Sequence, residues 1–411
     1  MPLIQTTHSS LIPTAAARPA DDPIFLLNAE ATRRAQAGEA VINATLGALM
    51  EDDGTLAVMP SAVEALQRVP AKKAASYAPI LGAKTFLEAV VRDTFEAAPS
   101  VAKLATAAGT PGGTGALYQA VTTFLEPGQA LLTTNWFWSP YQTIASQSRR
   151  AVETFETFDA RGRFDVGGFA AGLDRLVQRQ GRALAILNFP CHNPTGYSLD
   201  ADEWREVADV VRRAGERAPV ALLVDLAYAR FGADASQAWV AQAERMTETA
   251  TLLVAWTASK SFAQYGARVG ALVAVHPDDA ERARIQNALA FSCRGTWSNC
   301  NHGGQLAIAE LLTDPALRAK VDLERARLVR LLDERVQVFN REAARAGLRH
   351  PRYEGGFFVS VFAPDSEAAA ERLKAAGVFL VPLPGALRVA LCSTPARDVP
   401  RLVSALKDAI R

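Results

Sequence analysis

One lysine stands apart because of its place in the sequence. Between Lys103 and Lys320 the chain contains a single lysine, Lys260, and it follows an apolar run in LLVAWTASKSFAQYGARVG. A lysine at the end of a strand most often extends its ammonium group into water. A half-buried amine instead has a lowered pKa and can form a Schiff base with a carbonyl compound. Lys260 alone does not decide between these interpretations.

A glycine-rich segment, GTPGGTGAL, precedes a helical pattern at residues 118–125. Glycines before a helix allow backbone N–H groups to approach a phosphate at the positive end of the helix dipole, and Thr114 would add a hydroxyl. A flexible turn fits the segment equally well. It is not a Walker A motif, because no Gly-Lys-Ser/Thr follows, and its spacing differs from the dinucleotide fingerprint GxGxxG.

Polar side chains also follow two other apolar runs. Asp225 ends VALLVD with Tyr228 close behind it, and Asn193 lies in NFPCHNPTG after LAILNF. Each residue singly fits a turn or a cap. Ligands of doubly wound sheets, however, bind at the carboxyl ends of strands. Together with Lys260 these residues match the needs of pyridoxal phosphate, which requires an amine, phosphate donors, a carboxylate for its pyridine nitrogen and donors to its phenolic oxygen.

Such a site requires strands whose ends meet at one edge of a sheet. Short apolar runs, separated by helical patterns, predict strands at residues 130–134, 183–188, 220–225, 252–256 and 267–275. Their continuous hydrophobicity indicates burial on both faces. A helical pattern at 201–214 follows the expected N-cap Asp200, and this alternation predicts a mostly parallel α/β sheet.

A long helical pattern from about Asp314 to Gly347 predicts a helix that joins two domains. Beyond it, residues 355–362 and 387–392 have the pattern of strands. A chain of 411 residues suggests two or three domains. The domains that we predict are an N-terminal arm at 1–22, a large cofactor-binding domain at 57–320, and a small α+β domain formed by 23–56 with 321–411.

Composition excludes several classes of protein. The chain is 49% hydrophobic and has a net charge of +1, so nothing indicates a nucleic-acid partner, and its apolar runs are too short to cross a membrane. Four scattered cysteines suit a reducing compartment, and the first twenty residues lack a signal-peptide pattern, so we expect a cytoplasmic location. The five histidines lie outside motifs such as HExxH, so we expect no metal.

On these motifs the sequence resembles the class I aminotransferases of pyridoxal-phosphate fold type I, closest to the aspartate and aromatic amino acid branch. The resemblance runs from DPIFLLNAEATR to RVALCST, with the motifs in the family's order. It implies a large domain, whose mostly parallel seven-stranded sheet is sandwiched by helices, and a smaller α+β domain. It also implies a homodimer with shared active sites.

The resemblance implies roles for individual residues. Lys260 would form the Schiff base, Asp225 would bind the pyridine nitrogen, and Tyr228 with Asn193 would bind the phenolic oxygen. The other implied cofactor contacts are Gly113, Thr114, Trp138, Thr257, Ser259, Arg268 and, from a neighbouring subunit, Tyr77. The implied substrate contacts are Gly47, Trp138, Asn193, Arg294 and Arg388. Within this set, Arg388 would hold the α-carboxylate, and Arg294 a second carboxylate from across the dimer interface.

Two departures from the family pattern concern aromatic residues. Tyr141 stands where the aspartate branch usually has a histidine that supports the cofactor aspartate, so the surroundings of Asp225 must differ. Trp136 and Phe137 lie beside Trp138. They would either favour bulky apolar substrates or pack in the core.

We therefore expect a pyridoxal-phosphate-dependent aminotransferase. The resemblance implies a ping-pong transfer between an aromatic amino acid or aspartate and a 2-oxo acid, with 2-oxoglutarate as the expected acceptor. A pyridoxal-phosphate lyase or synthase would use the same residues. A regulatory module fused to a DNA-binding segment is disfavoured, because no extension of helix-turn-helix length precedes Asp22. A dinucleotide oxidoreductase lacks its glycine fingerprint.

Overall fold

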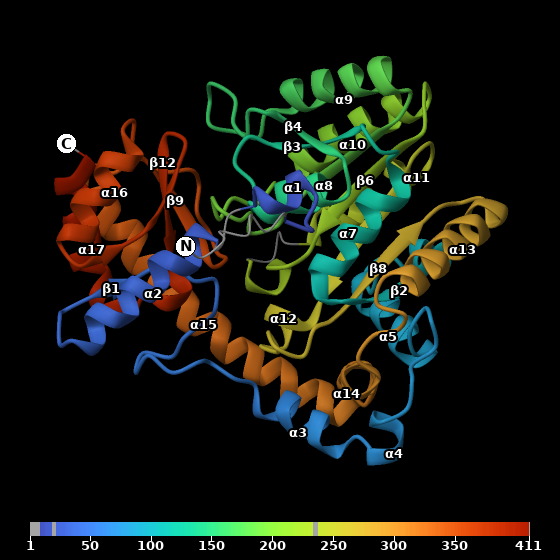
Figure 1. The fold of residues 1–411 in the computed structure, drawn as a ribbon, viewed down its shortest axis with the longest axis horizontal. Coiled ribbons are helices and arrows are strands. Elements are labelled where there is room, and N and C mark those ends of the chain that lie inside the picture. The colour runs from blue at the N-terminus through green and yellow to red at the C-terminus, as the bar shows by residue number, and fades with distance from the viewer. Residues whose placement is uncertain (1–8, 19–21, 233–236, 411) are drawn as a thin grey trace, which may run out of the picture.

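The computed structural model describes residues 9–18, 22–232 and 237–410 (Figure 1). The arm predicted at 1–22 lies partly outside these residues, and its described part contains the short helix α1 (Pro13–Ala16). Among the described residues, no helix is long and apolar enough to span a membrane, and no group of three or more His, Cys, Asp or Glu side chains could hold a metal.

A seven-stranded sheet forms the centre of the larger part of the molecule, in the order β2-β8-β7-β6-β5-β3-β4. Its strands are β2 (Ala105–Pro111), β3 (Ala130–Thr134), β4 (Ala151–Phe155), β5 (Ala183–Leu187), β6 (Val220–Asp225), β7 (Thr251–Thr257) and β8 (Val269–Val275). Only β8 runs antiparallel to its neighbours. The predicted α/β class and the mostly parallel sheet are confirmed.

Side chains alternate between two cores, one on each face of this sheet. Leu132 and Leu222 belong to one core, whereas Leu131 and Leu223, the residues next to them in the chain, belong to the other. Helices α9 (Val166–Gln180) and α10 (Ala201–Gly215) cover the first face; α7 (Gly112–Phe124), α8 (Pro140–Gln147) and α13 (Asp279–Gly295) cover the second (Figure 1). Burial on both faces explains the continuous hydrophobicity of these strands.

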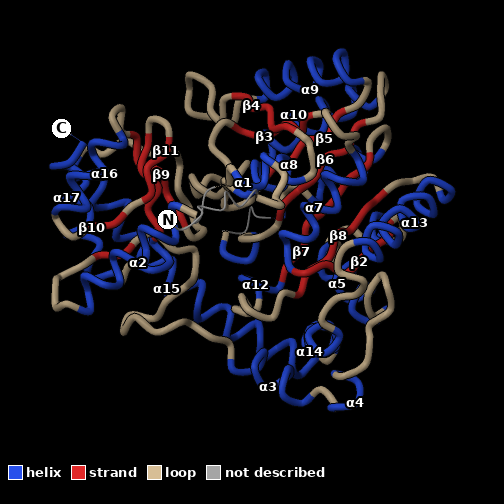
Figure 2. The backbone as a smooth tube through the Cα atoms, in the orientation of Figure 1, coloured by secondary structure: helices blue, strands red, loops and turns tan. Residues whose placement is uncertain are grey.

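The long helix α15 (Pro315–Ala346) connects the two ends of the molecule (Figure 2). The carboxylate of Asp314 accepts the N–H groups of Ala316 and Leu317 and so caps its start. Gly347 ends it at a φ of 72°, a left-handed conformation that glycine adopts at little cost. Both ends of the predicted long helix are confirmed.

A smaller unit lies beyond α15. Its strands are β1 (Ile42–Asn43), β9 (Phe358–Phe362), β10 (Val378–Phe379), β11 (Val381–Leu383) and β12 (Ala386–Ala390). Strand β12 pairs with β9 and β11, while β1 from the N-terminal part pairs with β10. This pairing agrees with a small unit built from both ends of the chain, and the boundaries at 57 and 320 stay predictions.

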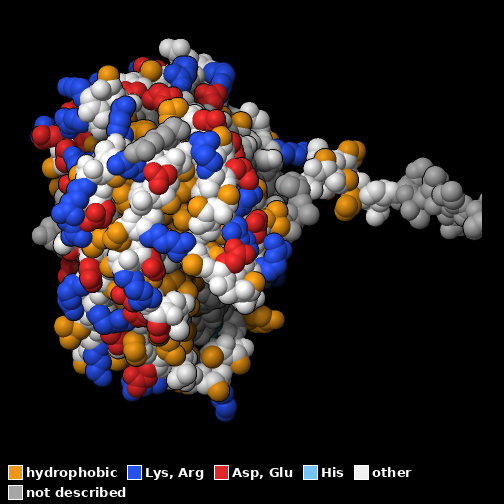
Figure 3. All heavy atoms as spheres, turned by 90° about the vertical axis from the view of Figure 1, so that its left-hand side faces the viewer, with side chains coloured by type: hydrophobic (Ala, Val, Ile, Leu, Met, Phe, Trp, Pro, Cys, Tyr) orange, Lys and Arg blue, Asp and Glu red, His pale blue; other side chains and the backbone are white. Residues whose placement is uncertain are grey.

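The remaining helices pack around these sheets. They are α2 (Pro23–Gln36), α3 (Pro60–Arg68), α4 (Ala71–Ala74), α5 (Lys84–Thr94), α6 (Pro99–Ala102), α11 (Ala243–Thr247), α12 (Ala258–Ser261), α14 (His302–Thr313), α16 (Ser366–Ala375) and α17 (Val399–Ile410). On the face shown in Figure 3, basic and acidic side chains are interspersed. That mixture matches the near balance of 44 basic and 43 acidic residues.

Candidate active site

Ten of the eleven residues predicted to contact a cofactor line one cavity. They are Gly113, Thr114, Trp138, Asn193, Asp225, Tyr228, Thr257, Ser259, Lys260 and Arg268. Three further residues, Leu117, Asn188 and Ala227, complete the lining. The cavity lies where β6 and β7 end and where α7 and α12 begin, which is the usual ligand position of a doubly wound sheet.

The glycine-rich segment was predicted to precede a helix. In the structure it instead forms the first turn of helix α7. Helix α7 begins at Gly112, directly after β2, and has no side-chain cap, so no side chain accepts its first N–H groups. Gly112 has a φ of 71°, and a Cβ there would collide with the guanidinium of Arg268. The segment therefore brings free backbone donors and an arginine together.

Two hydroxyl groups extend this set of donors. The Arg268 Nη1 atom donates to the Ser259 hydroxyl across 3.4 Å and to the Tyr265 carbonyl across 2.9 Å. The Thr257 hydroxyl lies 3.0 Å from that of Ser259 and caps the short helix α12 by accepting the Ser259 N–H. A guanidinium, two hydroxyls and a helix N-terminus at one place can bind a phosphate group.

Lys260 follows β7 within α12 and is half-buried. Its Nζ lies 5.2 Å from the centre of the Tyr228 ring and 5.9 Å from that of Tyr265. Among the described residues its ammonium has no hydrogen-bond or ion-pair partner. Burial lowers the pKa of this amine, and the charge of Arg268 lowers it further, whereas Asp225 opposes the shift. A larger fraction of the amine is therefore unprotonated, and the unprotonated amine is the form that acts as a nucleophile.

Asp225 ends β6 and is buried. Its Oδ2 atom accepts the Tyr141 hydroxyl across 2.7 Å, and Oδ1 accepts the Ala227 N–H across 3.1 Å. Burial raises the pKa of the carboxyl, while these two hydrogen bonds and the charge of Lys260 act in the opposite direction. The hydroxyl of Tyr141 thus reaches Asp225 directly.

Asn188, which the sequence analysis did not single out, connects two predicted site residues. Its amide donates to the backbone carbonyl of Asp225 across 3.0 Å and its Oδ1 accepts the Asn193 N–H across 2.9 Å. The Asn193 amide in turn donates to the Tyr228 hydroxyl across 3.4 Å. Asn188 follows β5 directly, and this position at a strand end was the signal that could have identified it.

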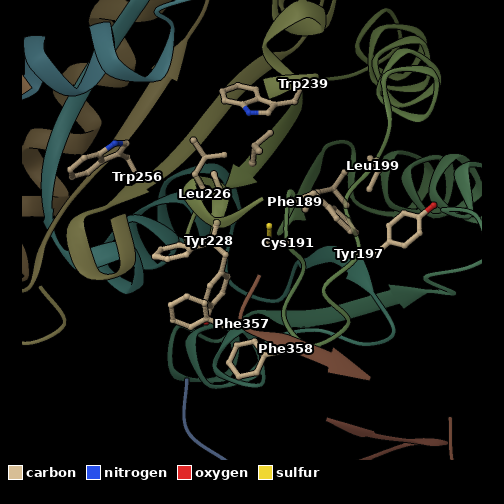
Figure 4. Close-up of a cluster of buried hydrophobic side chains, with 14 of the residues drawn as sticks. Phe189, Cys191, Tyr197, Leu199, Leu226, Tyr228, Trp239, Trp256, Phe357 and Phe358 are labelled. Carbon is tan, nitrogen blue, oxygen red and sulfur yellow. The ribbon is translucent and has the colours of Figure 1, made fainter. Parts of the chain in front are cut away.

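Arg388 lies on β12 of the smaller unit, and neither it nor Gly47 belongs to the described lining of the cavity. Its guanidinium stacks 4.5 Å from the centre of the Phe358 ring, and Nη2 donates to the Thr45 carbonyl across 2.6 Å. The Nε atom is buried without an acceptor among the described residues. A Cβ on Gly47 would lie 2.7 Å from Phe358, so a glycine is required beside this ring. The Phe358 ring also packs against Tyr228, which lines the cavity (Figure 4). Phe358 therefore connects Arg388 to the cavity.

Tyr77 and Arg294 are not brought to the cavity within this single chain. Tyr77 is 89% exposed. Arg294 is exposed at the end of α13, where its Nη1 donates to the Ser298 hydroxyl across 2.7 Å. Both predicted contacts therefore depend on a second subunit.

Trp136 and Phe137 pack within the protein and do not belong to the described lining of the cavity. The Trp136 indole donates to the Pro384 carbonyl across 2.9 Å and packs on Phe362, so it links the large sheet region to the smaller unit. Phe137 stacks on Tyr141. Of the two interpretations offered for these residues, the structure favours packing over a substrate surface.

The structure combines a doubly wound sheet with a cavity at its strand ends, and a half-buried lysine lines that cavity. The family described as "Aminotransferase class I and II" matches residues 39–406, and the chain belongs to this family. This membership agrees with the resemblance inferred from the sequence.

Relatives with assigned names are similar over different lengths. The aromatic-amino-acid aminotransferase of Pseudomonas aeruginosa is 34% identical over 51% of this chain, and the alignment spans only about half of that relative. The aspartate aminotransferase of the same organism is 28% identical over 81% of this chain and 83% of its own length. The aromatic-amino-acid aminotransferase of Escherichia coli is 30% identical over 83% of this chain and 86% of its own length.

Solved structures share the whole fold. An aminotransferase from Anaerococcus prevotii has a TM-score of 0.91 at 30% identity and covers 98% of this chain and 100% of its own. An aromatic-amino-acid aminotransferase from Burkholderia pseudomallei, covalently bound to pyridoxal phosphate, has a TM-score of 0.82 at 24% identity. The match covers 98% of this chain and 100% of that one.

The residues around the cavity fit pyridoxal phosphate. The uncapped first turn of α7 and the Arg268 guanidinium suit its phosphate, and Asp225 suits its pyridine nitrogen. The Asn193 amide nitrogen uses one N–H toward the Tyr228 hydroxyl and has a second, which suits the phenolic oxygen.

Proposed function

We propose that this chain is a pyridoxal-phosphate-dependent aminotransferase, which moves an amino group between an amino acid and a 2-oxo acid. The observation that carries the proposal is Lys260, a half-buried amine of lowered pKa in the same cavity as Asp225 and the donors around Arg268. When bound, pyridoxal phosphate supplies a ring that withdraws electrons from the α-carbon of the amino acid.

The residues of the cavity would hold the cofactor and move protons. Lys260 would bind the cofactor through its amine and, when free, would take the proton from the substrate α-carbon. Asp225 would hold a negative charge at the pyridine nitrogen, and Tyr228 would donate to the phenolic oxygen. Backbone N–H groups at Gly113 and Thr114 would hold the phosphate, together with the side chains of Thr114, Thr257, Ser259 and Arg268. Trp138 would stack on the ring.

Substrate recognition centres on Arg388. A planar guanidinium holds a carboxylate through two parallel hydrogen bonds, and the Nε of Arg388 has no other acceptor among the described residues. Burial is costly for an unpaired guanidinium and lowers the pKa of Arg388, so an incoming carboxylate relieves that cost. Gly47 lies beside the Phe358 ring on which Arg388 stacks. Asn193 and Trp138, which line the cavity, are the other substrate contacts that we propose.

The substrates that we propose are an aromatic amino acid or aspartate as donor and 2-oxoglutarate as acceptor, in a ping-pong cycle. The named relatives, which are aromatic-amino-acid and aspartate aminotransferases, support this choice. They also argue against the lyase or synthase alternative. The four cysteines are all free, which supports a reducing compartment such as the cytoplasm.

A donor panel tests the proposed function. The full chain is incubated with pyridoxal phosphate, 2-oxoglutarate and each of phenylalanine, tyrosine, aspartate and an apolar aliphatic amino acid as a comparison. We expect equimolar keto acid and glutamate from at least one of the first three donors. Loss of carbon dioxide or ammonia from the donor without glutamate formation would assign the protein to the lyases instead.

We further propose a homodimer in which Tyr77 and Arg294 reach the neighbouring active site. Their exposure in the single chain supports this arrangement, since neither contacts its own cavity. Light scattering of the loaded protein should give twice the monomer mass, and activity should fall on dilution below the dissociation constant of the dimer. A fully active monomer would refute shared sites.

Replacing Arg294 with alanine should weaken the use of aspartate and glutamate but spare phenylalanine. The loss for the dicarboxylates should be roughly 2–5 kcal/mol, because the variant leaves a desolvated carboxylate without its partner. The measurement is kcat/KM for each donor. Arg284→Ala, on the same helix α13 and paired with Glu281, is the matched control and should change neither value. Equal losses for both donor types in Arg294→Ala would mean that Arg294 is structural.

A further inference from the structure

Tyr141 is buried and does not belong to the described lining of the cavity, yet it contacts a residue that does. Its hydroxyl donates to Oδ2 of Asp225 across 2.7 Å. The other oxygen, Oδ1, accepts the backbone N–H of Ala227 across 3.1 Å. Among the described residues, Tyr141 is the one side chain that donates to this carboxylate. Each oxygen has two lone pairs, so both can still accept from a ligand in the cavity.

The surroundings of Tyr141 fix the position of its hydroxyl. Its ring stacks on Phe137 at a centroid distance of 6.2 Å and an interplanar angle of 10°. The edge of Trp138 packs against it at 5.8 Å and 89°. The Tyr141 N–H also donates to the Trp138 carbonyl across 2.9 Å. One residue thus connects Trp138 and Asp225, both of which line the cavity.

We propose that Tyr141 is a positioning residue that orients Asp225 toward the pyridine nitrogen of the cofactor and keeps its carboxyl group ionised. The inference rests on the proposed function and deepens it. A short hydrogen bond from a neutral hydroxyl to a carboxylate stabilises the charged form. Without Tyr141, the buried carboxyl would keep only the backbone donor of Ala227 and the more distant charge of Lys260.

Because position 141 is a tyrosine, its hydrogen bond to Asp225 does not change with pH in the neutral range. The titratable groups that act on Tyr141 are Asp225 and Tyr228, and the charged group that acts on Asp225 is Lys260. Burial and the neighbouring carboxylate raise the pKa of Tyr141 well above its usual value, so its hydroxyl keeps its proton throughout the neutral range. A histidine at this position would titrate near neutral pH.

The test compares two ligands with the Tyr141→Phe variant. One ligand is pyridoxal phosphate, and the other is its analogue with a C–H group in place of the ring nitrogen. We expect Tyr141→Phe to weaken binding of pyridoxal phosphate by roughly 10–100-fold, the effect of one hydrogen bond to a charged group. Binding of the analogue, which cannot pair with Asp225, should stay near that of the wild type. Both dissociation constants come from absorbance or fluorescence titration, without turnover.

Tyr197→Phe is the matched control. The Tyr197 hydroxyl is also buried and donates across 2.7 Å to a buried carboxylate, that of Glu203, outside the described lining of the cavity. Its removal should lower stability but leave the binding of both ligands unchanged. Equal weakening of both ligands in Tyr141→Phe, or no weakening of either, would overturn the inference. Failure of the wild type to bind pyridoxal phosphate would instead overturn the proposed function.

A second substitution covers the case in which Tyr141→Phe does not fold. Incorporation of 3-fluorotyrosine at position 141 keeps the ring and makes its hydroxyl a stronger donor. Pyridoxal phosphate should then bind more tightly than to the wild type at a pH where the phenol is protonated, while the analogue should not. Identical affinities for both ligands in the fluorinated and natural proteins would overturn the inference.

Discussion

Replacing Lys260 with alanine should abolish amino transfer while the fold survives. The side chain is half-buried and makes no hydrogen bond among the described residues, so its removal leaves no partner unsatisfied. The reaction, in contrast, loses both the covalent attachment of the cofactor and the group that moves the α-proton. Proton transfer by a positioned side chain alone contributes roughly 10²–10⁴-fold, and the loss of attachment adds to this.

The measurement is the single-turnover rate of keto acid formation by protein loaded with pyridoxal phosphate. Lys320→Ala removes an exposed lysine of helix α15 and serves as the control, which should keep the wild-type rate. An addition of methylamine, which can act as a diffusible base, should restore part of the rate in Lys260→Ala. Turnover by Lys260→Ala within tenfold of the wild type would exclude Lys260 from the reaction.

Asp225→Asn should lower the rate by about 10²–10³-fold, the scale of losing one preorganised electrostatic contact in a buried site. The amide cannot hold the pyridine nitrogen protonated, so the ring loses its capacity to withdraw electrons. The fold should survive, because the amide oxygen can accept the Ala227 N–H while the Tyr141 hydroxyl turns to accept from the amide nitrogen.

The rate of Asp225→Asn is compared with that of Asp278→Asn. Asp278 caps helix α13 by accepting the Glu281 N–H, and asparagine is an equally good N-cap, so this variant should match the wild type in rate and stability. Circular dichroism confirms that both proteins are folded. If Asp225→Asn were as active as the control, the carboxylate at the end of β6 would have no role at the pyridine nitrogen.

Strands buried on both faces were predictable because burial leaves a continuous apolar run. Strands β3 and β6 have the predicted bounds, and β7 extends one residue further at each end. Strands β2 and β4 were not predicted. Strand β4 lies at an edge of the sheet with several residues exposed or half-buried, and β2 consists mainly of alanine and threonine with a glycine and a proline, so neither has a strong apolar signal.

The candidate site was predictable to the extent that its residues follow strands or begin helices. Asp225 and Lys260 were found in this way, and the structure places them in one cavity. The resemblance placed Tyr141 at the position of a residue that supports Asp225. It did not give the direct hydrogen bond, because 84 residues separate the two and only the folded chain brings their oxygens within 2.7 Å. The predicted roles of Tyr77 and Arg294 follow from the family resemblance alone, because neither residue lines the cavity of its own chain.

Borohydride reduction followed by peptide mapping identifies the lysine that binds the cofactor. The full chain is loaded with pyridoxal phosphate, reduced, digested and analysed by mass spectrometry, with Lys260→Ala treated in parallel. We expect one stoichiometric pyridoxyl label per chain, on Lys260, and none on the variant beyond trace labelling of exposed lysines. A stoichiometric label on any other lysine, or an unlabelled Lys260 in protein that has bound the cofactor, would exclude Lys260 as the residue that forms the Schiff base.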